Sequence, residues 1–401
     1  MIKFFTAGES HGKSLSAIIE GFPSNLKINF EQVNSDLKRR QGGYGRGGRM
    51  KIESDEIEIL SGIRFGKTLG TPISLLIKNN DWVNWSGRMS ADKKVKVEKI
   101  TIPRPGHADL VGVSKYNFND IRNSIERSSA RETAARVAVG AFAKELLAQF
   151  GITVTSFVES IGGIYSDEKY YGKLLEKGNI PAKEFNEIVE NANRSSVGVL
   201  STSQEEKIIK RIKKAKKDGD SLGGTCVILA ANLPVGLGSF VHYERRIDTI
   251  ISKNVMSINA LKAIEFGLGF SIADLPGSKV HDEIINDDGS FTRTTNYSGG
   301  MEGGISNGMP IIIRVAMKPI ATLMKPLKSV DLKTGKPIEA RHERSDTVAV
   351  TACRVVAEAM LAWSIAEVFV EKFGGDSIEE MKDNFNNYTK KTKTRLKRNF
   401  N

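Results

Sequence analysis

The sequence predicts a single α/β domain built from two similar halves. Apolar stretches that alternate like strands are interleaved with Ala- and Val-rich stretches in which apolar residues recur at three- and four-residue steps, as in helices. The same features also recur in the same order in the two halves of the chain. Because strands with an apolar face need helices to cover them, the repeat favours one intertwined domain with an approximate two-fold axis over two separate domains.

Four pairs of segments make up the repeat, and each pair is predicted to form the same element. The pairs are the strands 14–23 and 224–234, the helices 30–40 and 246–266, the glycine-rich approaches to a G-x-P-I strand 61–78 and 298–315, and the helices 126–146 and 343–363, which begin with Glu-Arg-Ser. These matches place the two pseudo-repeats at about 1–150 and 218–375, within one domain that covers 1–385.

Two segments fall outside the repeat. Residues 163–217 are polar and charged and have no counterpart in the first half, so we expect a helical insertion on the surface. Residues 386–401 form a basic tail, which we expect to be disordered or bound to a surface.

The composition is typical of a soluble globular protein, with 40% hydrophobic and 26% charged residues. No apolar run is long enough to span a membrane, and the start MIKFFTAGES lacks the apolar core of a signal peptide, so we expect a cytoplasmic location. Cys226 and Cys353 lie in apolar stretches and are expected to be buried free thiols. Neither His11 nor His107 has metal-ligand spacing to another His, Cys or carboxylate, so we predict no metal site.

The net charge of +12 is informative through its placement. Part of it lies in the tail, and part in Arg39, Arg40, Arg46 and Arg49, which are interleaved with glycine. The glycines of 43–48 fit G-x-G-x-x-G, but a helix precedes them and a strand follows, which is the reverse of a dinucleotide fold. We therefore expect a loop that closes over an anion, with a solvated basic turn as the alternative. A nucleic-acid-binding protein is a weaker alternative, because no recognition motif accompanies the charge.

The segment that starts RPGHADL leads into the helix that the rest of the chain surrounds. Small Ala and Gly residues on the apolar stripe of this helix allow close packing, so we expect it to be central and buried. Ser128, Ser129 and Arg131 lie in its predicted first turns, and Arg104 and His107 precede it. Hydroxyls, backbone amides and arginines at a helix start favour an anion. A nearby imidazole suits proton transfer close to neutral pH.

The N-terminal motif GESHGKS supplies a second imidazole, His11, next to Ser10. Residues 7–14 also fit a loose P-loop, and S-x-x-K with the later K-T-G fits penicillin-binding signatures. A P-loop needs a helix after it, whereas the residues that follow alternate like a strand. A P-loop phosphotransferase therefore remains only an alternative to an enzyme that uses two histidines for proton transfer.

Eight motifs together resemble the signature set of the chorismate synthase family. They are GESHG (8–12), RRQGGYGRGGR (39–49), RPGHAD (104–109), RSSARETAARVA (127–138), SINA (257–260), GGISNGMPI (303–311), AMKPIAT (316–322) and ERSD (343–346). The resemblance runs from residue 1 to about 372, and only the insertion and the tail depart from it.

The resemblance implies a carbon–oxygen lyase that converts 5-enolpyruvylshikimate 3-phosphate to chorismate in the shikimate pathway to aromatic amino acids. The implied reaction is an anti-1,4-elimination of phosphate and a C6 hydrogen that requires reduced FMN without net redox change. A β-α-β sandwich of antiparallel sheets around central helices and a homotetramer are implied as well. Whether NADPH reduces the flavin on this chain, or an external flavin reductase does so, stays open. A polyanionic substrate and cofactor fit the recurrence of arginine, whose planar fork binds carboxylate and phosphate.

Three residues take proton-transfer roles by this resemblance. His11 resembles the acid that protonates the departing phosphate, His107 resembles the residue that protonates or hydrogen-bonds reduced flavin, and Asp346 resembles the carboxylate that helps the flavin to take the C6 proton. Ser10 and Ser129 neighbour these groups and are expected to relay protons.

The resemblance divides the remaining site residues between substrate and cofactor. The expected substrate-binding residues are Arg40, Arg46, Arg49, Arg104, Arg131 and Arg344. The expected FMN contacts are Arg127, Ser128, Ser129, Asn259, Ala260, Gly303, Lys318, Thr322 and Arg344.

Overall fold

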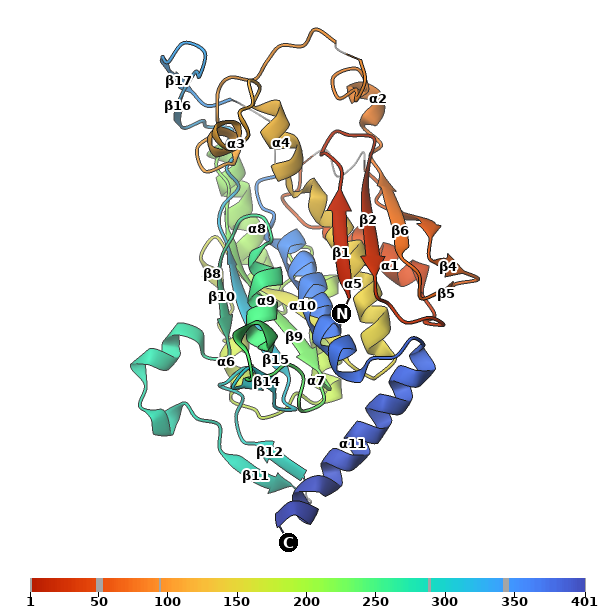
Figure 1. Ribbon diagram of the computed structural model, residues 1–401. Coiled ribbons are helices and arrows are strands. Elements are labelled where there is room, and N and C mark those ends of the chain that lie inside the picture. The colour runs from red at the N-terminus through yellow and green to blue at the C-terminus, as the bar shows by residue number, and fades with distance from the viewer. Residues whose placement is uncertain (1, 48–52, 94, 288–289, 342–345, 401) are drawn as a thin grey trace.

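Two antiparallel sheets form the frame of the protein (Figure 1). The computed structural model describes residues 2–47, 53–93, 95–287, 290–341 and 346–400. The first sheet has the order β1-β2-β6-β3, with strands at Lys3–Ala7, Ser14–Glu20, Ile73–Lys78 and Ile57–Ser61. The second has the order β10-β15-β9-β7-β8, with strands at Leu261–Phe266, Ile311–Met317, Gly224–Ala231, Thr153–Ile161 and Ile164–Tyr165.

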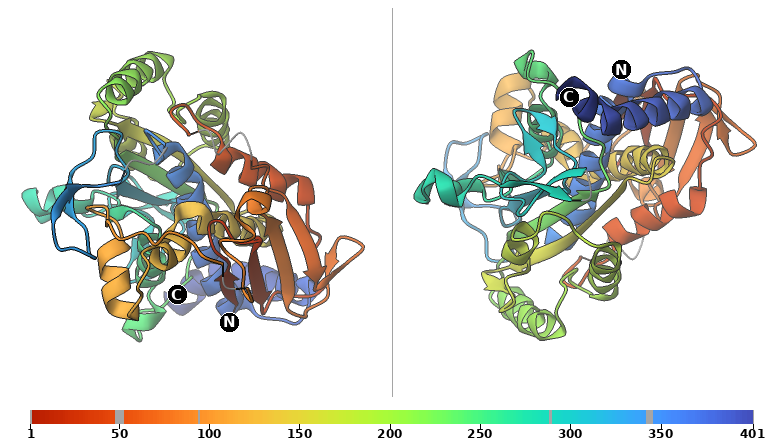
Figure 2. Two further views of the ribbon diagram at one scale, coloured as in Figure 1. Left: turned by 90° about the horizontal axis from the view of Figure 1, so that it is seen from above. Right: turned by 90° about the horizontal axis from the view of Figure 1, so that it is seen from below.

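Two long helices lie between the sheets. α5, at Thr133–Ala148, contacts β1, β2 and β6, whereas α10, at Val350–Phe373, contacts β7 and β9. The two helices pack on each other, α1 (Phe30–Gln41) packs on α5, and α9 (Ile247–Met256) packs on α10. Figure 2 shows the two sheets on opposite sides of these helices. The mixed helix-and-strand class predicted from the sequence is therefore confirmed.

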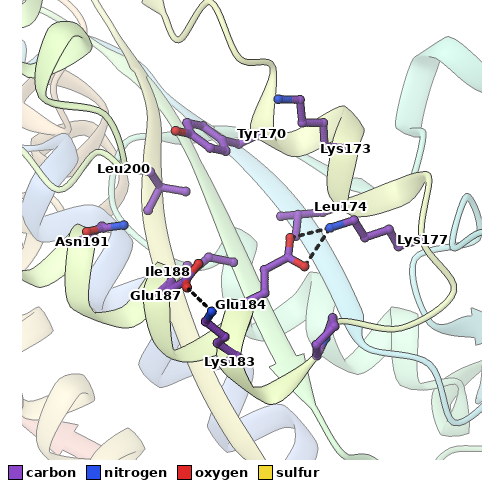
Figure 3. A pocket seen from close by; sticks show the side chains of 11 residues that line it. Tyr170, Lys173, Leu174, Lys177, Lys183, Glu184, Glu187, Ile188, Asn191 and Leu200 are labelled. Carbon is purple, nitrogen blue, oxygen red and sulfur yellow. Dashed lines mark hydrogen bonds and ion pairs between the residues drawn. The ribbon is translucent and has the colours of Figure 1, made fainter.

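The insertion 163–217 is helical, as expected, but it is more than a surface feature. It contains α6 (Tyr170–Leu175), α7 (Ala182–Arg194) and α8 (Thr202–Lys217). Its apolar side chains form a second core against the outer face of the second sheet, where Phe185 and Ile188 join strand residues such as Leu229. A cavity of ≈ 420 Å³ lies between α6 and α7, with Leu174, Ile188 and Leu200 among its lining residues and lysines and glutamates around them (Figure 3).

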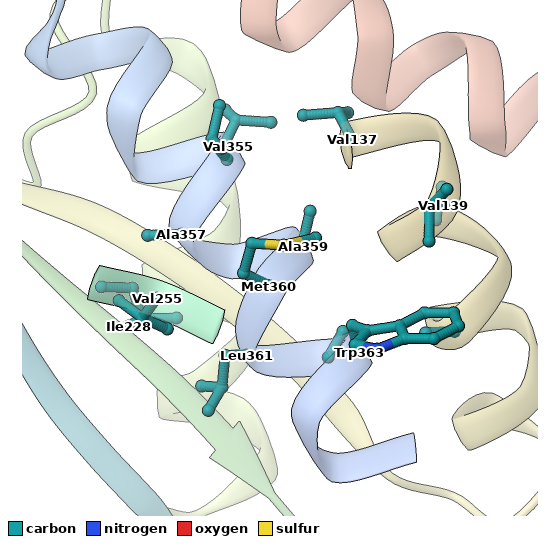
Figure 4. Packing of buried hydrophobic residues seen from close by; sticks show 14 of the residues in the cluster. Val137, Val139, Ile228, Val255, Val355, Ala357, Ala359, Met360, Leu361 and Trp363 are labelled. Carbon is teal, nitrogen blue, oxygen red and sulfur yellow. The ribbon is translucent and has the colours of Figure 1, made fainter. Parts of the chain in front are cut away.

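Small side chains let α5 and α10 approach closely (Figure 4). A Cβ atom on Gly140 would lie 2.4 Å from the Cβ of Ala359, which is too close for two carbon atoms, so a larger residue at 140 would push the helices apart. Trp363 of α10 reaches across to Phe4 of β1, with ring centroids 4.8 Å apart. The expectation of a central, buried helix is confirmed. Cys226 is also buried and free, and so is Cys353, both as expected.

Two predicted helices are shorter than the sequence pattern indicates. Within 126–146, α4 (Arg122–Ser128) ends at Ser129, whose extended backbone and hydroxyl lead into a 3-10 turn at Ala130–Glu132 before α5 begins. The helix predicted for 246–266 ends with α9 at Met256, and the residues that follow form β10. Hydrogen bonds of the Ser129 side chain and pairing of β10 with β15 outweigh the helical spacing in these segments.

The remaining elements are short, except for the last helix. The hairpins are β4–β5 (Ile63–Arg64, Lys67–Thr68), β11–β12 (Ile284–Asp287, Ser290–Arg293), β13–β14 (Met301–Glu302, Ile305–Ser306) and β16–β17 (Lys328–Val330, Pro337–Glu339), and the short helices are α2 (Trp82–Trp85) and α3 (Asp109–Tyr116). α11 spans Ile378–Phe400, so residues 386–400 of the expected tail continue a helix and are not disordered. Within the described part of the chain, no helix combines the length and apolarity needed to cross a bilayer.

Candidate active site

His11 lies in the turn between β1 and β2, and the carboxylate of Glu126 in α4 holds it in place. Glu126 accepts two hydrogen bonds from this residue, from the backbone nitrogen at 2.7 Å and from Nδ1 at 3.0 Å. Trp85 stacks on the imidazole with ring centroids 3.9 Å apart. Burial tends to raise the pKa of Glu126, but hydrogen bonds and charge from His11, and charge from Arg122, outweigh it, so that pKa lies below its usual value.

His107 is held in a similar way by Asp109 at the start of α3. The imidazole Nδ1 lies 2.5 Å from Oδ1 of Asp109. Arg104 bonds the same carboxylate through its backbone nitrogen, Nε and Nη2 at 2.9–3.0 Å. Burial opposes ionisation of Asp109, yet these hydrogen bonds and the Arg104 charge hold its pKa well below the usual range.

Ser10 and Ser129, which we expect to relay protons, contact each other through their hydroxyl groups. The Ser129 hydroxyl lies 3.1 Å from that of Ser10, and the Ser10 backbone nitrogen donates to the carbonyl of Glu126 at 3.0 Å. Ser129 lies between two helices, however, and not within the first turns of one continuous helix. The turn from β1 to β2 is thus fixed to the end of α4 by both backbone and side-chain contacts.

Arg40 and Arg131 form the buried basic part of the site. Both guanidinium groups bond Asp55, Arg40 at 3.3 Å and Arg131 at 2.6 Å, and Arg131 also bonds Asn79 at 2.8 Å. Burial, together with the like charges of Arg131 and Arg46, lowers the pKa of Arg40 to about 9 although Asp55 opposes the shift. Such crowding of cations favours an anionic ligand.

Arg46 of the glycine-rich loop pairs with Asp346 at 2.9 Å, close to the start of α10. The loop is also held by the insertion, because the Tyr44 nitrogen donates to the Ser196 carbonyl at 2.7 Å. The prediction of a loop that carries arginine toward an anion site is consistent with this position. Arg49 and Arg344 lie outside the described residues.

Several of the expected FMN contacts are connected by hydrogen bonds, in a series that ends next to His107. Arg127 bonds the Thr6 carbonyl at 2.9 Å, and Asn259 bonds the Ser128 carbonyl at 3.0 Å. Ala260, in the left-handed region at φ +66°, accepts from the Lys318 nitrogen at 3.0 Å. The Lys318 side chain then reaches the Gly106 carbonyl, next to His107, and Thr322 accepts from Arg104 at 3.0 Å.

Gly303 is the expected FMN contact that these groups do not reach. It lies in the β13–β14 turn, whose next residue, Gly304, accepts from the nitrogen of Ile247 at the start of α9. Asn259 and Ala260 follow the other end of α9. A ten-residue helix is about 15 Å long, so Gly303 lies that far from the rest of the group within one chain.

Three residues of the site were not predicted from the sequence: Glu126, Asp109 and Trp85. Asp109 follows His107 by two residues in RPGHAD, a spacing that could have suggested it as the partner. Glu126 is 115 positions from His11, and no local pattern connects the two residues. Trp85 comes from α2, in a segment without a recognisable motif.

Two other features are not the site. β2 begins at Ser14 directly after the GESHGK loop, so the P-loop interpretation is wrong because a strand, not a helix, follows the loop. The ≈ 420 Å³ cavity of the insertion contains none of the histidines or arginines described above. Its lysines also have local partners, such as Lys177 with Glu184 at 2.7 Å (Figure 3).

A mixed fold that holds two carboxylate-bound imidazoles and several buried arginines is typical of an enzyme for anionic ligands. Comparison with known proteins specifies the class. The chorismate synthase family model matches residues 2–370. Chorismate synthase of Enterococcus faecalis is 50% identical over 393 residues, covering 96% of this chain and 98% of that protein. Chorismate synthase of Aquifex aeolicus is 51% identical over 397 residues, covering 98% of each chain.

A solved structure agrees with these relatives. A crystal structure of chorismate synthase superposes with a TM-score of 0.79 at 42% sequence identity, and the match covers 98% of both chains. The chain belongs to the chorismate synthase family, and it is therefore a lyase. The resemblance carried by the eight motifs is confirmed.

Proposed function

We propose that the protein converts 5-enolpyruvylshikimate 3-phosphate to chorismate by anti-1,4-elimination of phosphate, with reduced FMN as cofactor. One observation supports this most: His11 and His107, distant in sequence, are each fixed by a buried carboxylate that also pairs with an arginine. Membership of the chorismate synthase family supports this choice of substrate.

The arginines suit a substrate that carries two carboxylates and a phosphate. Arg40, Arg104 and Arg131 are each 7% exposed or less, so their charges act in a medium of low dielectric constant, where they attract anions strongly. Arg46 lies beside them on the glycine-rich loop. We assign these four residues, with Arg49 and Arg344, to the substrate's anionic groups.

The donor set between the histidines fits FMN. Arg127 and Lys318 supply positive charge for a phosphate, while Ser128, Ser129, Asn259 and Thr322 supply polar groups for a ribityl chain and a flavin ring. When bound, reduced FMN supplies the electron-rich ring that assists the elimination without net redox change.

Three side chains then handle protons. His11 gives a proton to the departing phosphate, and His107 hydrogen-bonds or protonates the flavin. Asp346 assists removal of the C6 hydrogen, and its contact with Arg46 ties that carboxylate to the substrate-binding loop. Ser10 and Ser129 connect these positions as a relay.

The test is an anaerobic assay with reduced FMN and 5-enolpyruvylshikimate 3-phosphate. Release of phosphate together with chorismate absorbance is expected, and absence of both would refute the proposal. Replacing the chemical reductant by NADPH separates a chain that reduces its own flavin from one that needs an external flavin reductase.

We also propose the β-α-β sandwich with an internal pseudo-two-fold repeat. Read from β1, the first sheet runs β1-β2-β6-β3, and read from β7, the second runs β7-β9-β15-β10. The predicted counterparts β2 and β9, and β6 and β15, take the same places in both orders. An experimental structure in which 1–150 superposes on 218–375 with α5 on α10 would support the repeat, and a different order of matched strands would reject it.

A homotetramer is the assembly that we propose. The face of the first sheet that points away from α5 carries exposed apolar side chains, with Phe5 70% and Leu60 56% exposed, and Phe5 lies opposite Ile18 in the strand register. Such a face suits burial against another copy of the chain. Light scattering should give four times the 44.0 kDa chain mass, and Phe5→Glu should reduce it. A wild-type monomer would contradict the proposal.

A further inference from the structure

Glu126 is an almost fully buried carboxylate that contacts both the backbone and the ring of His11. Its side chain is 2% exposed, whereas that of His11 is 18% exposed. One oxygen accepts from the His11 backbone nitrogen at 2.7 Å, and the other lies 3.0 Å from Nδ1. Two bonds to one residue fix the position of its backbone and the rotation of its ring together, as a single bond would not.

The charged and aromatic groups around this pair reinforce the arrangement. Arg122, one turn before Glu126 on α4, bonds the same carboxylate at 3.3 Å. Its guanidinium also lies 5.0 Å from the ring of Trp85, which covers the His11 imidazole. Glu9 lies beside Gly12 in the same turn, and Arg88 reaches the Trp85 ring at 5.6 Å. Of these groups, Glu126 is the one that hydrogen-bonds both His11 and Arg122.

We propose that Glu126 is the positioning residue for His11, which it holds with Nδ1 protonated and with Nε2 directed to the ligand. The inference rests on the proposed function only for the role of His11 as the general acid. A hydrogen bond to one ring nitrogen selects the tautomer and so determines which nitrogen acts.

The experiment compares Glu126→Gln with Glu126→Ala in the full-length protein. Glutamine retains an acceptor for the Nδ1 proton but has no charge, so the descending alkaline limb of the kcat–pH profile should move down by about one pH unit or more. Alanine removes charge and acceptor, so kcat should fall further, by at least about ten-fold at neutral pH. The KM for substrate should change less than kcat in both variants.

Glu145→Gln is the matched control. Glu145 is a half-buried carboxylate near the far end of α5, and among the described residues it accepts a hydrogen bond from the Asn29 nitrogen, at 3.3 Å. Asn29 caps α1 and is not part of the turn that carries His11, so replacing Glu145 should leave the pH profile and kcat unchanged. A wild-type profile in Glu126→Gln, with active wild-type enzyme, would overturn the proposal.

A second readout does not depend on turnover. Nitrogen-15 NMR of histidine-labelled protein, with His11→Asn used to assign the signal, should show the neutral His11 ring protonated at Nδ1 in the wild type. A neutral ring that carries its proton at Nε2 instead of Nδ1 would overturn the proposal even if Glu126→Gln failed to fold. Wild-type protein that forms no chorismate but retains the Nδ1 proton would reject the proposed function and leave the Glu126 contact supported.

Discussion

The two histidines of the site have the same kind of partner but different electrostatic surroundings. Asp109 is shared between His107 and Arg104, which bonds both carboxylate oxygens and whose side chain is only 6% exposed. Glu126 is shared between His11 and Arg122, which makes a single bond at 3.3 Å and is 23% exposed. Among the described residues, an aromatic ring stacks on His11 but none stacks on His107.

This difference indicates how one type of contact can serve two tasks. Arg104 offsets most of the Asp109 charge, so that carboxylate mainly orients His107 and anchors the segment before α3. The Glu126 charge is offset less, because Arg122 makes a single bond to it and is more exposed. Both carboxylates position an imidazole, and the degree to which an arginine offsets their charge distinguishes them.

Removal of the imidazoles gives the largest expected effect. His11→Ala and His107→Ala should each lower kcat by roughly ten- to ten-thousand-fold, the range for loss of a positioned proton-transfer group. Steady-state chorismate formation is the measurement, and His242→Ala is the control because His242 is largely exposed. A wild-type kcat in both His11→Ala and His107→Ala would show that neither imidazole takes part in proton transfer.

The carboxylates should differ in their contribution to stability. Asp109→Ala leaves buried Arg104 without its carboxylate and should cost about 3–5 kcal/mol. Glu126→Ala should cost less, about 1–3 kcal/mol, because Arg122 can turn toward water. Urea unfolding, analysed with one m-value for both variants, gives the two losses of unfolding free energy. A larger loss for Glu126→Ala than for Asp109→Ala would contradict our interpretation.

Lowering the pH should remove the contributions of Glu126 and Asp109 to folding stability one after the other. The pKa of each carboxylate is lower in the folded protein than its ordinary value of 3.8 for Asp109 or 4.5 for Glu126. Each contribution to stability is therefore complete above that ordinary value and is lost as pH falls through the folded pKa. Because the pKa of Asp109 lies further down, melting temperatures between pH 6 and 3 should show the Glu126 contribution disappearing first. A steeper early loss in Glu126→Gln than in the wild type would contradict this.

The smallest effect is expected at the stacked ring. Trp85→Leu removes a contact of about 0.5–1.5 kcal/mol, so kcat should fall only a few-fold, and Trp85→Phe should restore most of it. Neither substitution should alter the contact between His107 and Asp109. A loss as large as that of His11→Ala would mean that Trp85 contacts the ligand directly.

The sequence predicted the class of fold and most members of the site, for reasons that are local. Period and composition indicated the strands and the buried helix of Thr133–Ala148, and motifs indicated the histidines and arginines. The helix break at Ser129 was not predictable, because it depends on side-chain contacts with Arg131 and Ser10. Glu126 was missed for a related reason: its link to His11 exists only after β1, β2 and α4 have packed.

The contact between Tyr44 and Ser196 limits where tags or deletions can be introduced into this protein. Through this contact, the segment between α7 and α8 supports the glycine-rich loop. Ile212 of α8 is also close to the loop, because a Cβ on Gly45 would lie 3.1 Å from its side chain. We expect tags or shortened connectors near residue 196 to weaken substrate binding by the glycine-rich loop without unfolding the protein. The outer end of the insertion, around α6, is the safer place for such grafts.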